Sequence, residues 1–159
     1  MSLILNFETS SKNCSVTLSS DGKLISNFDL EDDKYRHSEL LTSTIKDILN
    51  QNNISAKELS AVAIGIGPGS FTGLRIGFSV AKGLCYPHKI NLIGISSLKI
   101  LANSIKVDSG DIIPMINDKG NFYYLSTFEN KLNEVGNPTL EQVDTCLLYT
   151  SDAADDPAS

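Results

Sequence analysis

The stretch AVAIGIGPGSFTGLRIGFSVAKGL, residues 61–84, constrains the fold more than any other part of the sequence. It opens with a continuous apolar run, places five glycines between Gly65 and Gly77, and continues into a helical pattern. A continuous apolar strand is typical of a sheet that is covered on both faces. The stretch therefore predicts a buried strand over residues 61–66, a glycine loop, and a helix over residues 73–86 that Pro87 ends.

The preceding residues predict antiparallel strands and then a helix. Three short apolar or alternating runs, residues 3–9, 14–20 and 23–30, are separated by SSKN and by Asp21-Gly22. An Asp-Gly pair between two such runs is the strongest short-range hairpin signal. Apolar residues at helical spacing then predict an amphipathic helix over residues 37–53.

The order of the remaining elements indicates the fold class. Ser55 and Glu58 resemble a capping box. Residues 91–95 predict a fifth strand, and a third helix is expected from Ser96 to about residue 106. The order β-β-β-α-β-α-β-α predicts an α/β fold with a mixed five-stranded sheet, as in an RNase H-like, actin-like ATPase lobe.

The predicted domain organisation has three parts. Residues 1–108 form the first actin-like lobe, and residues 109–144 form an incomplete second lobe. Strands over residues 112–117 and 122–129 are expected to open that second lobe. Residues 145–159 are small and acidic without apolar periodicity, so we expect a non-native or disordered tail.

Composition limits the classes of partner and site. The chain has 13 Lys plus Arg against 19 Asp plus Glu, so its net charge of −6 would repel a bare phosphate backbone on average. No targeting or membrane-spanning segment is recognised, which predicts a cytoplasmic protein. Cys14, Cys85 and Cys146 are odd in number and lack a CxxC pair, so neither a disulfide framework nor a zinc site is indicated.

The glycine loop matches no catalytic or nucleotide motif. Gly73 is followed by Leu74 and Arg75, unlike the end of a Walker A loop, and the third glycine of a dinucleotide fingerprint is missing. The residues around Ser70 do not form a nucleophile elbow. No catalytic residue and no metal ligand are therefore assigned. Because helix N-termini attract anions, a candidate anion or nucleotide loop remains. Its residues are Gly69, Ser70 and Thr72.

The helix after the loop favours an interface. Gly73, Gly77 and Ala81 form a ridge of small residues, and most of the remaining circumference is apolar. We expect one side to pack on the sheet and another on a partner chain, beside the helix of residues 37–53. The alternative is that the second lobe of the same chain covers this helix. The predicted interface residues are His37, Leu41, Ile45, Gly73, Leu74, Ile76, Gly77 and Val80.

The motifs resemble those of one family. The run GPGSFTGLRIG, residues 67–77, is similar to the signature of the TsaB (YeaZ) family of bacterial tRNA threonylcarbamoyladenosine biosynthesis proteins. Its flanks, ETS at residues 8–10, HSELL at residues 37–41 and GISSL at residues 94–98, stand in the expected order. The resemblance covers about residues 3–130.

This resemblance implies an actin-like fold and a non-catalytic role. It implies a subunit required for N6-threonylcarbamoyladenosine (t6A) at tRNA position 37, acting as dimerisation partner and scaffold of the catalytic TsaD. It also implies the ATPase TsaE as a further partner, homodimers, tRNA contact only through the complex, and ATP used by the complex without tight binding to this chain. The alternatives are an actin-like nucleotide-binding ATPase and, less favoured, a glycoprotease-type peptidase.

The sequence departs from the family pattern at several positions. Asn117, Asp118 and Lys119 stand where the family usually has Asp-Ala-Arg, and Phe122 replaces a glutamate. Glu8 replaces the opening aspartate and is one methylene longer, so we expect it to misplace any metal or phosphate contact. Family members are longer, which predicts a truncated chain whose residues after about Asp144 are foreign.

Overall fold

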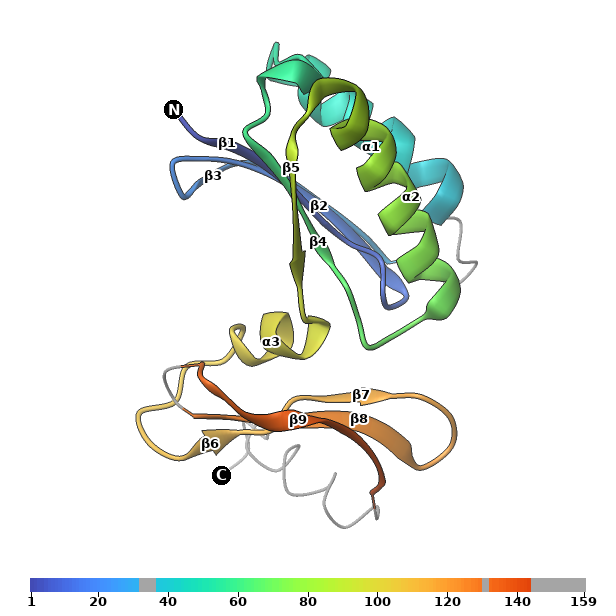
Figure 1. The fold of residues 1–159 in the computed structure, drawn as a ribbon, viewed down its shortest axis with the longest axis vertical. Coiled ribbons are helices and arrows are strands. Elements are labelled where there is room, and N and C mark those ends of the chain that lie inside the picture. Colours follow the sequence, from blue (N-terminus) through green and yellow to red (C-terminus); the bar gives the residue numbers. More distant parts are fainter. Residues whose placement is uncertain (32–36, 130–131, 144–159) are drawn as a thin grey trace, which may run out of the picture. The chain divides into compact units, whose positions relative to one another are not determined.

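The computed structural model describes residues 1–31, 37–129 and 132–143, and it divides into two compact units, residues 1–100 and 101–159 (Figure 1). No helix in these ranges is long and apolar enough to span a membrane.

The first unit is built on a mixed five-stranded sheet. Its strands are β1 (Leu3–Glu8), β2 (Asn13–Ser20), β3 (Lys23–Glu31), β4 (Ala61–Gly65) and β5 (Asn91–Ile95). They lie in the order β3-β2-β1-β4-β5. β1–β2 and β2–β3 are antiparallel, whereas β1–β4 and β4–β5 are parallel. The predicted mixed sheet is therefore confirmed.

The hairpin between β2 and β3 forms where it was predicted. Asp21 and Gly22 both have positive φ, 48° and 77°, and Ser20 pairs with Lys23 across the turn. A two-residue turn of this kind matches the right-handed twist of its strands, and Gly and Asp tolerate the left-handed region.

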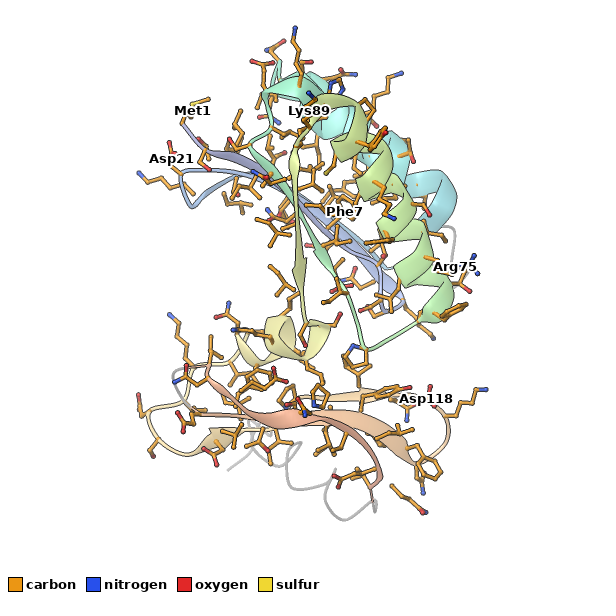
Figure 2. All side chains as sticks on the ribbon, viewed as in Figure 1. Met1, Phe7, Asp21, Arg75, Lys89 and Asp118 are labelled. Atoms are coloured by element: carbon orange, nitrogen blue, oxygen red, sulfur yellow. The ribbon has the colours of Figure 1, made fainter. Side chains whose placement is uncertain are left out.

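Two long helices, α1 (His37–Gln51) and α2 (Phe71–His88), lie side by side against the sheet (Figure 1). The core between them and the strands includes Leu5, Val16 and Leu18 of the antiparallel strands and Leu41 of α1. All five residues of β4 are buried, as a strand in the middle of a covered sheet should be. Phe7 points into this layer (Figure 2).

The capping box at Ser55 and Glu58 is confirmed. It starts η1 (Ala56–Glu58), a single 3-10 turn ahead of β4. The Ser55 backbone N–H donates to Glu58 Oε2 at 2.7 Å. This hydrogen bond gives a partner to a backbone N–H group that would otherwise lack one at the start of the helical turn.

The second and third helices differ from the predicted bounds. α2 begins at Phe71 because Ser70 caps it, and Pro87 lies inside its last turn instead of ending it. The helix closes at Lys89, which adopts the left-handed conformation at φ 55°. The prediction that Pro87 ends the helix was wrong, because a proline near the C-terminus removes only one helix hydrogen bond. α3 (Ser97–Ala102) is shorter than predicted.

The second unit contains a small antiparallel sheet. Its strands are β6 (Asp111–Ile112), β7 (Met115–Asn117), β8 (Phe122–Glu129) and β9 (Glu134–Gln142). β8 pairs with β6 and β7 along one edge and with β9 along the other. The predicted strand over residues 112–117 is interrupted at Pro114, which cannot donate to a ladder.

The sequence analysis missed β9. Every residue of this strand is exposed, so no apolar alternation marks it, and Gly136 and Pro138 lie within it. The structure places the division between units after residue 100, whereas the predicted lobe boundary was residue 108. The predicted tail, residues 145–159, lies outside the described residues, as does Cys146.

Candidate functional site

The carboxylate of Glu8, at the end of β1, joins three segments of the first unit. Its Oε1 accepts hydrogen bonds from the backbone N–H groups of Thr9 and Ser10, each at 2.8 Å. Its Oε2 accepts from the Ser97 hydroxyl at 3.1 Å, and the Gly67 N–H donates to that same hydroxyl at 3.2 Å. The longer side chain of Glu8 therefore reaches partners within its own chain.

A glycine makes room for this carboxylate. A Cβ atom on Gly65 would collide with the Glu8 carboxylate group. Gly65 is the last residue of the buried strand β4, which pairs with β1. Because Gly65 has no side chain, the Glu8 carboxylate at the end of β1 can occupy the space beside it. The first glycine of the loop is thus explained by packing inside this chain.

The candidate anion loop uses much of its hydrogen-bonding capacity internally. The Ser70 N–H donates to the Ser10 carbonyl at 2.6 Å, and the Ser70 hydroxyl accepts from the Gly73 N–H at 3.2 Å. Gly69, at φ 150°, lies so close to Ser10 that a Cβ would come within 2.5 Å of its carbonyl oxygen. Thr72 is exposed. The anion site at Gly69, Ser70 and Thr72 stays a prediction.

The ridge of small residues faces the chain itself. A Cβ on Gly73 would collide with the Thr9 carbonyl oxygen, and one on Gly77 would lie 2.5 Å from Thr9 Oγ1. The Thr9 hydroxyl donates to the Gly73 carbonyl at 2.8 Å, and Thr9 and Ala81 are buried. The reason for predicting Gly73 and Gly77 at a partner interface was therefore wrong: they let α2 approach the end of β1.

Two other predicted interface residues also belong to the core. Leu41 and Ile45 of α1 are 0% and 3% exposed within this chain, so they pack against its own sheet and not against a partner. Leu74, Ile76 and Val80 are half-buried and remain interface predictions. His37 begins α1, but its side chain lies outside the described residues.

The exposed side of α2 presents a different surface, here called the aromatic–cationic face. It consists of Phe71, Arg75, Phe78, Lys82 and Tyr86. The three rings are 73%, 44% and 89% exposed. Arg75 projects from the outer side of the helix (Figure 2). These residues recur at helical spacing, which places them along one side.

Each cation of this face lies over a neighbouring ring. The Arg75 guanidinium carbon is 5.4 Å from the centre of the Phe71 ring, and Lys82 Nζ is 4.6 Å from that of Phe78. A groove of about 350 Å³ lies beside the aromatic–cationic face, and its lining includes Ile66, Phe71 and Phe78. The sequence analysis missed the three aromatic residues, although their spacing with Arg75 and Lys82 could have shown a common stripe.

No group of three or more His, Cys, Asp or Glu in the described ranges is arranged to hold a metal ion. Of the described cysteines, Cys14 and Cys85 are free and buried. Burial, and to a smaller degree the charge of Glu8, raises the pKa of the Cys14 thiol above its ordinary value of 9.0.

The comparison with protein families decides the family. The model described as TsaD: tRNA N6-adenosine threonylcarbamoyltransferase matches residues 31–150, three quarters of the chain. The chain belongs to this family. The resemblance to TsaB (YeaZ) is also confirmed, because curated TsaB proteins are among its relatives.

The curated TsaB relatives are matched over only part of their own length. TsaB from Escherichia coli is 37% identical over 99 residues, which are 62% of this chain and 42% of the relative. TsaB from Buchnera aphidicola subsp. Acyrthosiphon pisum is 33% identical over 135 residues, which are 84% of this chain and 60% of the relative. The chain thus spans about half the length of these proteins.

Solved structures show the same fold. YeaZ from Pseudomonas aeruginosa superposes with a TM-score of 0.81 at 24% identity, covering 91% of this chain and 70% of that one. The ethanolamine utilization protein EutJ from Carboxydothermus hydrogenoformans gives a TM-score of 0.54 at 12% identity, over 97% and 57% of the two chains. The predicted actin-like architecture is therefore confirmed.

Proposed function

We propose that this chain is a non-catalytic subunit of the machinery that forms t6A at position 37 of tRNA. One observation carries the proposal: the family match over residues 31–150, with relatives that are named as tRNA threonylcarbamoyladenosine biosynthesis proteins. Because those proteins are longer than the matched region, the role of the whole protein is inferred for this chain. Such a role implies a cytoplasmic protein that meets tRNA through its complex.

We further propose TsaD as the direct partner. The outer side of α2 supports this, since three large aromatic side chains are exposed there and the half-buried Leu74, Ile76 and Val80 flank them. Exposed apolar groups gathered on one element are typical of interfaces. TsaE and a second copy of the chain are the other partners in the proposal.

A scaffold role also fits the internal contacts of the loops. The Glu8 carboxylate occupies the Thr9 and Ser10 amides, and Ser70 caps α2 with its own hydroxyl. Backbone amides and a helix N-terminus are the groups that would otherwise hold a phosphate. We therefore propose that the complex, and not this chain, binds ATP tightly. The alternative, an actin-like nucleotide-binding ATPase, rests on the order of the elements and on the glycine loop.

Rescue of tRNA modification tests the function. The chain is expressed in bacteria depleted of their own TsaB, and t6A in purified tRNA is quantified by mass spectrometry. We expect t6A to return and the chain to co-elute with TsaD in size-exclusion chromatography. Absence of both effects, with the chain folded by circular dichroism, would refute the proposal. Titration of the isolated chain with ATP tests the alternative, which micromolar binding without TsaD would support.

A further inference from the structure

The outer edge of β3 is the least protected strand edge in the part of the chain that the structure describes. β3 stands at the end of the strand order β3-β2-β1-β4-β5, and its ladder runs along β2 only. Three of its apolar side chains are exposed: Leu24 at 66%, Ile25 at 42% and Phe28 at 39%. An unpaired edge with exposed apolar groups is a template for pairing with another chain.

The other edge strands carry features that block such pairing. β5 has five residues, and β6 and β7 have fewer. β9 has nine residues, as β3 does, but it contains Gly136 and Pro138, and proline has no N–H to donate. β3 contains neither glycine nor proline. Its one irregularity, at Ile25, leaves residues 26–31 in an unbroken ladder with β2.

We propose that β3 pairs antiparallel with β3 of a second copy of this chain, so that two five-stranded sheets join into one. The inference rests on the proposed function, because it gives a surface to the second copy named there. In a two-fold contact the same patch lies on both sides, and an axis perpendicular to the sheet sets the two edge strands antiparallel. The outward N–H and C=O groups of β3 then gain partners.

The charges of β3 are arranged for antiparallel pairing with itself. Lys23 begins the strand, and Asp29 lies near its other end; both are exposed. Asp29 accepts a hydrogen bond from Asn27 Nδ2 at 2.8 Å, which holds the carboxylate on the strand. Antiparallel pairing about the middle of the strand brings Lys23 of each copy near Asp29 of the other. Parallel pairing would instead set like charges side by side, which is unfavourable.

The apolar side chains of β3 are placed to close the same contact. Phe28 pairs with Val16, which is 1% exposed, so Phe28 lies on the helix-covered face of the sheet at the margin of the core. The two-fold axis keeps this face on the same side in both copies, so both Phe28 rings lose water at the join. The contact leaves the proposed TsaD surface free, because α2 packs on β4 and β5 at the other end of the strand order.

Charge variants of the full chain test the proposal. We would measure self-association by sedimentation velocity over a range of protein concentrations. Lys23→Asp and Asp29→Lys each place like charges at both ends of the join, so each variant alone should dimerise about tenfold more weakly than the wild type. In an equal mixture of the two variants every Asp meets a Lys, and dimerisation should return to the wild-type level.

Two further variants make the test specific. Glu141→Lys on β9 is the matched control, because Glu141 is an exposed acid on an edge strand that also accepts a side-chain hydrogen bond from two residues before it, at 2.8 Å. It should leave dimerisation unchanged. Leu24→Lys changes the most exposed apolar residue of β3 and should also weaken dimerisation. Circular dichroism checks that each variant is folded.

The outcomes separate this inference from the proposed function. If the single variants dimerise as the wild type does, or if their mixture fails to restore the dimer, the β3 contact is overturned. A wild-type chain that stays monomeric while it binds TsaD overturns the inference and leaves the proposed function standing. If the β3 variants lose TsaD binding instead, this edge holds TsaD and the inference is overturned. Dimerisation that follows the charges without any rescue of t6A would support the inference and count against the proposed function.

Discussion

Gly77 and Gly83 of α2 should respond in opposite directions to the same substitution. Both lie inside the helix, where replacing glycine with alanine stabilises by about 0.5–1 kcal/mol through backbone entropy. Gly83 has nothing within 4 Å of an added Cβ, so Gly83→Ala should raise the free energy of unfolding by that amount. It is the control for Gly77, whose added Cβ would lie 2.5 Å from Thr9 Oγ1.

At Gly77 the cost of crowding exceeds the helix gain. Thr9 is β-branched, 2% exposed, and its hydroxyl donates to the Gly73 carbonyl at 2.8 Å, so it has little freedom to move. Overpacking of a close contact costs about 1–3 kcal/mol, and loss of the hydrogen bond adds about 1 kcal/mol. After the helix gain, Gly77→Ala should lower the free energy of unfolding by about 1–3 kcal/mol.

Urea denaturation followed by far-UV circular dichroism measures both effects. With a slope of about 2 kcal/mol/M, the Gly77→Ala midpoint should fall by about 0.5–1.5 M and the Gly83→Ala midpoint should rise by about 0.3–0.5 M. Thr9→Ala removes the nearest atom, so it should reduce the cost of Gly77→Ala in a double-mutant cycle. Equal stabilisation by both alanines would refute the close contact between α2 and the end of β1.

Three further predictions concern other contacts. Glu8→Ala should lower the free energy of unfolding by about 1–3 kcal/mol because the amides of Thr9 and Ser10 and the Ser97 hydroxyl lose their acceptor. In urea titrations, Gly65→Ala should lower the free energy of unfolding strongly in the wild type but only slightly in the Glu8→Ala background. Equal losses in the two backgrounds would contradict the collision between a Gly65 Cβ and the Glu8 carboxylate. Since burial raises the Cys14 pKa, the folded chain keeps a proton that the unfolded chain loses, so stability should fall as pH rises above 9.0, and a Cys14→Ala variant should show a smaller fall. Gly22→Ala should lower the free energy of unfolding by about 1 kcal/mol through its positive φ alone, because the added Cβ would meet nothing within 4 Å. If thermal unfolding shows no loss of stability, the turn adapts to the added side chain.

The element order of the first unit could be predicted because its signals are local. The Asp21-Gly22 pair fixes a hairpin, the apolar run of β4 marks a central strand, and the residues of α1 repeat at helical spacing. The second unit gave weaker signals. β9 is exposed along its length and carries no alternation, so only pairing with β8 defines it.

The partners of individual side chains could not be predicted in this way. The sequence alone determined the family, the mixed sheet and the presence of a glycine loop before a helix, because those depend on spacing along the chain. Only the tertiary structure decided which neighbour each glycine faces. Gly65, Gly73 and Gly77 lie against Glu8 and Thr9, residues far away in sequence that parallel pairing of β1 and β4 brings close. In the folded chain the small residues of α2 face inward and its aromatic–cationic face lies outside.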